Sequence, residues 1–268
     1  MTSPDPRNAA SGIDISTAKA PGVRTVALLQ PLQWLRRGGA DLLRCPWPGL
    51  LHGLAMAMFG AALLLLAHQR FWLLAGAFSG FLLVAPLLAT GLYAVSRALE
   101  KGQTASLRTA LSAWWPRDSK LVLFGLLLAL AGTGWVLTSA ALITRFALSA
   151  VNSPADFLHA VVLAPTGHLF EGWLLLGGAL ATPVFASSVV ALPLLLDRPV
   201  AVWPAVLTSV RAVLANPGAM ALWATLILAL TVLSMLATAL LGLIVVLPWL
   251  AHASWHAYRD LVEPASQS

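Results

Sequence analysis

Four stretches of this sequence contain no aspartate, glutamate, lysine or arginine, and each is 24 to 26 residues long. They are residues 45–69, 71–96, 121–144 and 172–196. A helix needs only about 20 apolar residues to cross the hydrocarbon core of a bilayer. A fifth such stretch, 212–258, is 47 residues long. As one helix it would measure roughly 70 Å at about 1.5 Å per residue, so it must fold back, and six membrane-spanning helices are expected.

The composition excludes an ordinary soluble protein, because 59% of the residues are hydrophobic and only 10% are charged. A membrane β-barrel would show short segments of alternating apolar and polar residues. Unbroken apolar runs such as residues 121–130 favour helices instead. The sequence therefore predicts an all-α, polytopic membrane bundle.

The domain boundaries follow from these runs. We expect a disordered cytoplasmic tail over 1–27, a transmembrane domain over 28–262 and a short tail over 263–268. The predicted spans are 47–67, 71–95, 120–142, 172–196, 217–236 and 239–258, with the last hairpin near Ser234 to Gly242.

The distribution of basic residues predicts the orientation. The N-terminal region to Arg44, the 97–120 and 197–211 loops and the C-terminal tail together hold fourteen lysines and arginines, and the opposite side holds Arg70 and Arg145 only. By the positive-inside rule both termini are expected in the cytoplasm. The formal charge of +6 then predicts contact with anionic lipid headgroups, and no nucleic-acid-binding motif accompanies it.

One unit is repeated three times: a cytoplasmic amphipathic helix, a span entering, a turn and a span returning. The cytoplasmic helices are expected at 31–44, 106–115 and 203–218, either along the membrane surface or as plain connecting helices. Each returning span carries a proline, and these are Pro86, Pro193 and Pro248. A proline bends a helix and frees the carbonyl four residues earlier, so these positions are predicted kinks or, alternatively, ligand carbonyls. The pairs Gly49/Gly53 and Gly76/Gly80 are small residues four apart, which predicts close helix packing.

The candidate metal ligands lie near the cytoplasmic ends of the first and last spans. They are Cys45, His52, His252 and His256. Cysteine and histidine suit zinc or iron. However, headgroups and water can also satisfy a histidine where a helix leaves the membrane, so we expect neither a metal nor another cofactor and keep a metal or haem site as a minority alternative. Because no catalytic motif is present, the protein is expected not to be an enzyme.

Several segments resemble a family of bacterial integral membrane proteins catalogued as a domain of unknown function. They include "PLQWLRRGGADL", "SGFLLVAPLLATGLYAVSRALEKG", "LPLLLDRPV" and "GLIVVLPWLAHASWHAYRDLV". The resemblance covers about residues 28–262 and implies a six-span inner-membrane protein. Members are sometimes labelled as similar to the haem-copper subunit of cytochrome c oxidase. This chain lacks the histidines of that subunit, so the resemblance supplies no activity.

The sequence thus predicts a non-enzymatic scaffold, assembly factor or lipid-interacting component of the bacterial inner membrane. A membrane-protein partner or a second copy of the chain fits such a role. Two alternatives remain open, a channel or permease for a small neutral or amphipathic solute and a metal- or haem-binding subunit. A water-lined cavity within the bundle would favour the channel.

Overall fold

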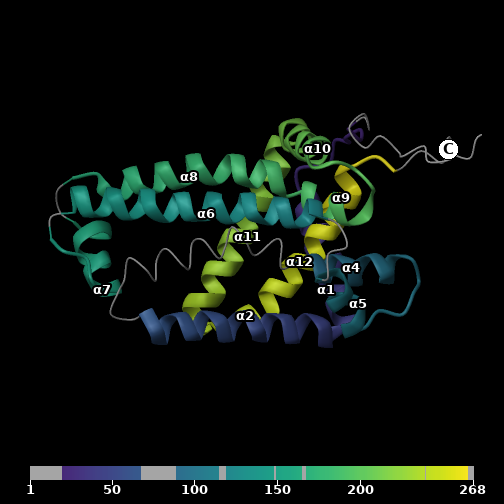
Figure 1. The fold of residues 1–268 in the computed structure, drawn as a ribbon, viewed down its shortest axis with the longest axis horizontal. Coiled ribbons are helices and arrows are strands. Elements are labelled where there is room, and N and C mark those ends of the chain that lie inside the picture. The colour runs from purple at the N-terminus through teal and green to yellow at the C-terminus, as the bar shows by residue number, and fades with distance from the viewer. Residues whose placement is uncertain are drawn as a thin grey trace, which may run out of the picture.

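A computed structural model describes residues 20–67, 89–114, 119–147, 149–164, 167–238 and 240–264 (Figure 1). These ranges are almost entirely helical, and their β pairing is limited to one isolated bridge between Val23 and Val262. Most of the second predicted span, 71–95, lies outside the described residues, as do Pro86, Gly76 and Gly80. The all-helical architecture predicted from the charge-free runs is confirmed for the described residues.

Three short helices each precede a long apolar helix. The pairs are α1 (Gln30–Arg44) with α2 (Pro46–Ala67), α5 (Leu107–Trp114) with α6 (Ser119–Phe146), and α10 (Val202–Ala215) with α11 (Pro217–Thr238). Pro46 and Pro217 are the first residues of α2 and α11. An N–H at this position has no acceptor within the helix, so a proline there costs no helical hydrogen bond. Consequently, only Cys45 and Asn216 separate α1 from α2 and α10 from α11.

The predicted span 172–196 is divided into α8 (Leu169–Ser188) and α9 (Ala191–Asp197). Pro193 explains part of this break, because proline has no N–H to donate to the carbonyl of Val189. At the same break, the amide of Val190 donates to Ser209 Oγ of α10 at 3.1 Å. Pro183, by contrast, remains inside α8.

Three helical segments of the described chain are long and apolar enough to cross a membrane. They are Lys120–Phe146, Leu169–Asp197 and Pro217–Thr238. The chain is therefore helical with at least these candidate spans, and α2 adds 22 residues without a charge.

The remaining elements are shorter or more polar. They are α4 (Thr90–Glu100), α7 (Pro154–Phe157), the π-helix η3 (Leu158–Val162) and α12 (Leu243–Leu261). Leu240 lies in the turn between α11 and α12, where the last hairpin is predicted, and its φ is 78°. Only a few per cent of residues other than glycine adopt such a conformation.

Figure 1 shows α6 and α8 side by side, α2 on the opposite side of the molecule, and α11 and α12 between them. The short helices α1, α4, α5 and α9 gather at one end, and α7 lies at the other. The helix α12 is central, since it packs against α1, α2, α4 and α11. Its side chains Trp255, Tyr258 and Leu261 are almost fully buried.

Two glycines allow α12 to approach its neighbours closely. A Cβ added to Gly38 of α1 would lie 2.5 Å from the backbone nitrogen of Ala253, and one added to Gly53 of α2 would lie 2.2 Å from the carbonyl oxygen of Ile244. Pro248 cannot donate to that carbonyl of Ile244. Gly53 therefore packs directly against the backbone oxygen that the proline leaves without its helical donor.

The expected disordered tail, 1–27, needs correction where the structure describes it. The amide of Arg24 donates to the carbonyl of Leu261 at 2.8 Å, and the amide of Glu263 donates to that of Gly22 at 3.0 Å. The amide of Val26 donates to Asn216 Oδ1 at 2.7 Å. These bonds order residues 22–26 because they satisfy the backbone of an extended segment, a possibility that composition alone does not reveal.

Candidate functional site

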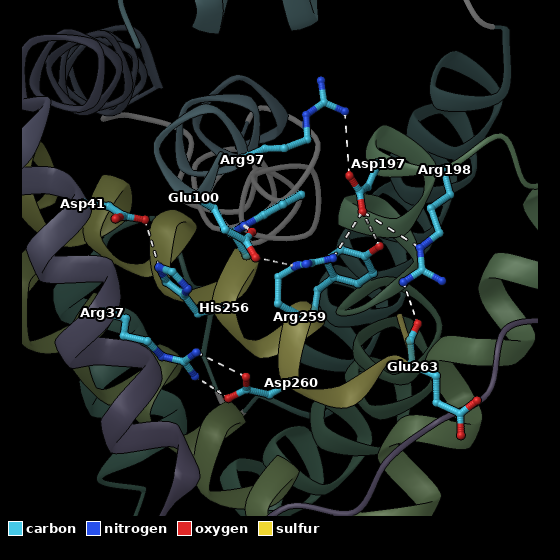
Figure 2. A network of polar contacts seen from close by, with 12 residues as sticks. Arg37, Asp41, Arg97, Glu100, Asp197, Arg198, His256, Arg259, Asp260 and Glu263 are labelled. Atoms are coloured by element: carbon cyan, nitrogen blue, oxygen red, sulfur yellow. Dashed lines mark hydrogen bonds and ion pairs between the residues drawn. The ribbon is translucent and has the colours of Figure 1, made fainter. Parts of the chain in front are cut away.

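The C-terminal half of α12 is the centre of a polar network that joins helices from distant parts of the chain (Figure 2). We call this network the charged layer. Its residues are Arg37, Asp41, Ser96, Arg97, Glu100, Asp197, Arg198, His252, His256, Arg259 and Asp260. It lies at the end of the molecule where α1, α4 and α9 gather.

Asp41 of α1 accepts two hydrogen bonds within this layer. Ser96 Oγ donates to Asp41 Oδ2 at 2.8 Å, and His256 Nε2 lies 2.9 Å from the same oxygen. Burial raises the pKa of Asp41, but the hydrogen bonds with His256 and Ser96 outweigh burial and hold the pKa below its usual value of 3.8. Asp41 is therefore a buried carboxylate that is stabilised in its charged form.

The proton of Ser96 determines how His252 is bonded. Ser96 Oγ also lies 2.7 Å from His252 Nδ1. Because a serine has a single proton and Ser96 donates it to Asp41, we assign the donor role to His252 Nδ1. The Nε2 atom of His252 is then an acceptor, and it has no hydrogen-bond partner among the described residues.

Asp260 joins the end of α12 to α1. Its carboxylate accepts hydrogen bonds from Gln30 Nε2 at 2.8 Å, from Trp34 Nε1 at 2.9 Å and from the guanidinium of Arg37. Burial raises the pKa of Asp260, yet the bonds from Arg37, Gln30 and Trp34 bring it below its usual value. One carboxylate thus binds three side chains of α1.

Asp197 and Glu100 connect α4, α9 and α12. Tyr258 donates its hydroxyl proton to Asp197 at 2.7 Å, and Arg97 and Arg259 lie 4.0 Å and 3.8 Å from that carboxylate. Glu100 accepts hydrogen bonds from Trp255 at 3.0 Å and from Arg259 at 2.9 Å. The three carboxylates Glu100, Asp197 and Asp260 are each bound by protein donors, so this layer holds helices together and offers no free carboxylate for acid–base chemistry.

The sequence-predicted metal candidates do not form one cluster. Cys45 Sγ lies 3.4 Å from the carbonyl of Ala105, and His256 binds Asp41. His252 is fully buried beside Ser96, whereas His52 faces a cavity described below. Within the described ranges, no group of three or more histidine, cysteine, aspartate or glutamate residues has the geometry to hold a metal ion. The sequence predicts that water and headgroups bind the two histidines of α12. The structure instead places Ser96 at Nδ1 of His252 and Asp41 at Nε2 of His256.

The predicted packing residues fall at helix contacts or helix breaks. Gly49 and Gly53 lie where α2 meets α12, and Pro248 lies inside α12. Pro193 lies in α9, immediately after the break that follows α8.

A cavity of about 230 Å³ lies between α2, α4, α8, α11 and α12. Its described lining is mostly apolar and contains no aspartate, glutamate, lysine or arginine. The polar residues of this lining are His52, Tyr93, Ser188, Thr231 and Ser254. A concave, mainly apolar site with a few polar groups is typical of small-molecule binding.

The comparison with protein families covers part of this framework. Residues 73–197 match the family model described as "Predicted integral membrane protein (DUF2189)". The match confirms the predicted resemblance to a family of integral membrane proteins, over 73–197 and not over the whole of the predicted range 28–262. The DUF2189 segment includes Tyr93, Ser96, Glu100, Ser188 and Asp197, but α1, α2 and α12 lie outside it. No curated protein and no solved structure matches the chain.

Sequence reasoning missed Asp41, Ser96 and the cavity hydroxyls of Tyr93, Ser188 and Ser254. A single hydroxyl in an apolar helix gives no periodic signal, and Asp41 resembles any polar residue of an amphipathic helix. Their importance arises only when α12 lies against α1 and α4.

Proposed function

We propose that this protein is a non-enzymatic component of the bacterial inner membrane that binds a small amphipathic molecule between its helices. The observation that carries this proposal is the uncharged cavity beside α12. The charged layer supports the same conclusion, because its carboxylates are used in helix contacts. A mainly apolar lining favours retention of an amphiphile over a water-filled channel.

The volume indicates the size of that molecule. An engineered cavity of about 150 Å³ binds benzene, and pockets for drug-sized ligands begin at about 300 Å³. The cavity of about 230 Å³ lies between these values. A single ring or one short alkyl chain therefore suits it better than a whole phospholipid.

We further propose six spans in three repeated hairpins, with both termini in the cytoplasm. Three successions of a short helix followed by a long apolar helix, at α1–α2, α5–α6 and α10–α11, support this arrangement. The charged layer and Arg145, in the last turn of α6, belong to opposite ends of the long helices. In this orientation, anionic headgroups would contact the basic residues beside α1 and α5.

Cysteine labelling tests the orientation. In a Cys45→Ser background, Arg145→Cys is expected to react with a membrane-impermeant maleimide in intact cells. Arg108→Cys is expected to react only after the inner membrane is opened, because α5 would lie on the cytoplasmic side. The reverse pattern of labelling would contradict the proposed orientation.

Filling the cavity tests ligand binding. Ala181 of α8 lines the cavity, so Ala181→Phe is expected to weaken binding of ten-carbon amphiphiles about tenfold or more, since burying a phenylalanine-sized apolar group is worth about 1.5–3 kcal/mol. The ten-carbon probes are 1-decanol, decyl methyl ether and decanoate. Native mass spectrometry of the detergent-released protein would measure how many molecules of each probe are bound. The control is Ala179→Phe, on the same helix and, like Ala181, at an exposed position, but outside the cavity lining. Equal binding by both variants, or no binding by the unmodified protein, would rule out the proposed site.

A further inference from the structure

Two of the four hydroxyls in the described cavity lining donate their protons to carbonyl groups of their own helices. Ser188 Oγ donates to the carbonyl of Val184 at 2.7 Å, and Ser254 Oγ donates to that of Leu250 at 2.8 Å. A hydroxyl has one proton and two lone pairs. Both serines therefore present acceptor oxygens at the cavity.

Tyr93 lies beside Ser254, to which its hydroxyl is hydrogen-bonded. Both groups are hydroxyls, so Tyr93 can donate or accept in this bond.

A backbone acceptor lies beside Ser188. Val189 lines the cavity at the break between α8 and α9, and Pro193 has no N–H to donate to its carbonyl. This position is thus one of the proline-freed carbonyls that the sequence marks as a ligand candidate. Ser188 and this carbonyl therefore lie at the same end of α8.

The described lining contains neither lysine nor arginine, and His52 is its single residue of a type that can carry a positive charge. A buried carboxylate or phosphate requires paired positive charge or several donors. A ligand whose head only accepts hydrogen bonds would meet the acceptors of Ser188 and Ser254 without forming a bond. The favoured head is therefore neutral and donates a proton.

We propose that the cavity selects a neutral amphiphile with a hydroxyl head, such as an aliphatic alcohol or a phenol, whose proton is accepted beside Ser188 and Ser254. This selectivity rests on the proposed function, because it presupposes that the cavity binds an amphiphile. It adds the chemical class of the ligand. Fatty acid anions and esters are excluded by the same acceptors.

Three probes with the same ten-carbon chain test the selectivity. By native mass spectrometry near neutral pH, 1-decanol is expected to bind about tenfold more tightly than decyl methyl ether, which has an oxygen but no proton to donate. Decanoate is expected to bind more weakly than the alcohol as well, because its charge would be buried without a partner.

Matched serine variants locate the effect. Ser187 and Ser188 both donate to the carbonyl of Val184, but only Ser188 lines the cavity. Ser188→Ala is expected to reduce the preference for 1-decanol over the ether, whereas Ser187→Ala is expected to leave it unchanged. Ser254→Ala provides a second test on another helix and is expected to have the effect of Ser188→Ala.

The outcomes separate the two proposals. If all three probes bind equally, or if decanoate or the ether binds most tightly, the selectivity for a hydroxyl is overturned and the cavity remains a binding site. A preference for 1-decanol that survives both Ser188→Ala and Ser254→Ala also overturns it. If none of the probes binds, the proposed function itself fails.

Discussion

Gly53→Ala is expected to destabilise the protein more than any other single methyl addition in α2. The new Cβ would lie 2.2 Å from the carbonyl oxygen of Ile244 and 2.6 Å from its carbon, and both are backbone atoms that no side-chain rotation can move away. Separating α2 from α12 would loosen buried contacts, and we expect a loss of about 1–3 kcal/mol or more, as for other overpacked sites. Titration with SDS in mixed micelles would measure the free energy of unfolding.

Gly134→Ala is the matched control. A Cβ on Gly134 of α6 would have nothing within 4 Å, so alanine is expected to be neutral or to stabilise the helix by up to about 1 kcal/mol. If Gly53→Ala is as stable as Gly134→Ala, then α2 and α12 do not pack as the structure describes.

Asp41→Ala is expected to have the second large effect. The substitution removes the common acceptor of Ser96 and His256, and the side chain of Asp41 is only 6% exposed. Leaving a buried donor without its acceptor costs about 1–3 kcal/mol, and Asp41→Ala leaves two such donors. Glu171→Ala removes an exposed ion pair with His168 and is expected to cost less than about 1 kcal/mol. Similar losses in the two variants would argue against a buried network at Asp41.

The charge of Asp41 also predicts an acid dependence. Its pKa is lower in the folded protein than the usual 3.8, so the folded state favours the carboxylate. The resulting stability is fully present above the unfolded pKa and is lost as the pH falls through the lower folded pKa. We expect a smaller loss of stability below about pH 4 in Asp41→Asn than in the unmodified protein, with the remaining loss due in part to Asp260.

The sequence predicts the long helices well, because runs without charges determine where a chain can cross a bilayer. It predicts α1, α5 and α10 from amphipathic periodicity for the same local reason. It predicts a kink at Pro193 within a single span, but it does not predict that the helix is interrupted between α8 and α9. The hydrogen bond from Val190 to Ser209 becomes visible only in three dimensions.

The site was harder to predict than the fold. His252 and His256 have helical spacing that indicates one face, but their partners Ser96 and Asp41 are separated from them by 156 and 215 residues. No periodic pattern connects such distant positions. The cavity likewise depends on side chains from five helices. The sequence indicates that a water-lined cavity would favour a channel, but it does not show where a cavity lies.

The central place of α12 has a consequence for biosynthesis. The nascent chain makes Asp41, Glu100 and Asp197 long before Tyr258 and Arg259 leave the ribosome. Until then Asp41 lacks His256, Asp197 lacks Tyr258, and Glu100 lacks Trp255 and Arg259. The charged layer is therefore completed late, when the hairpin of α11 and α12 packs between helices that were synthesised earlier.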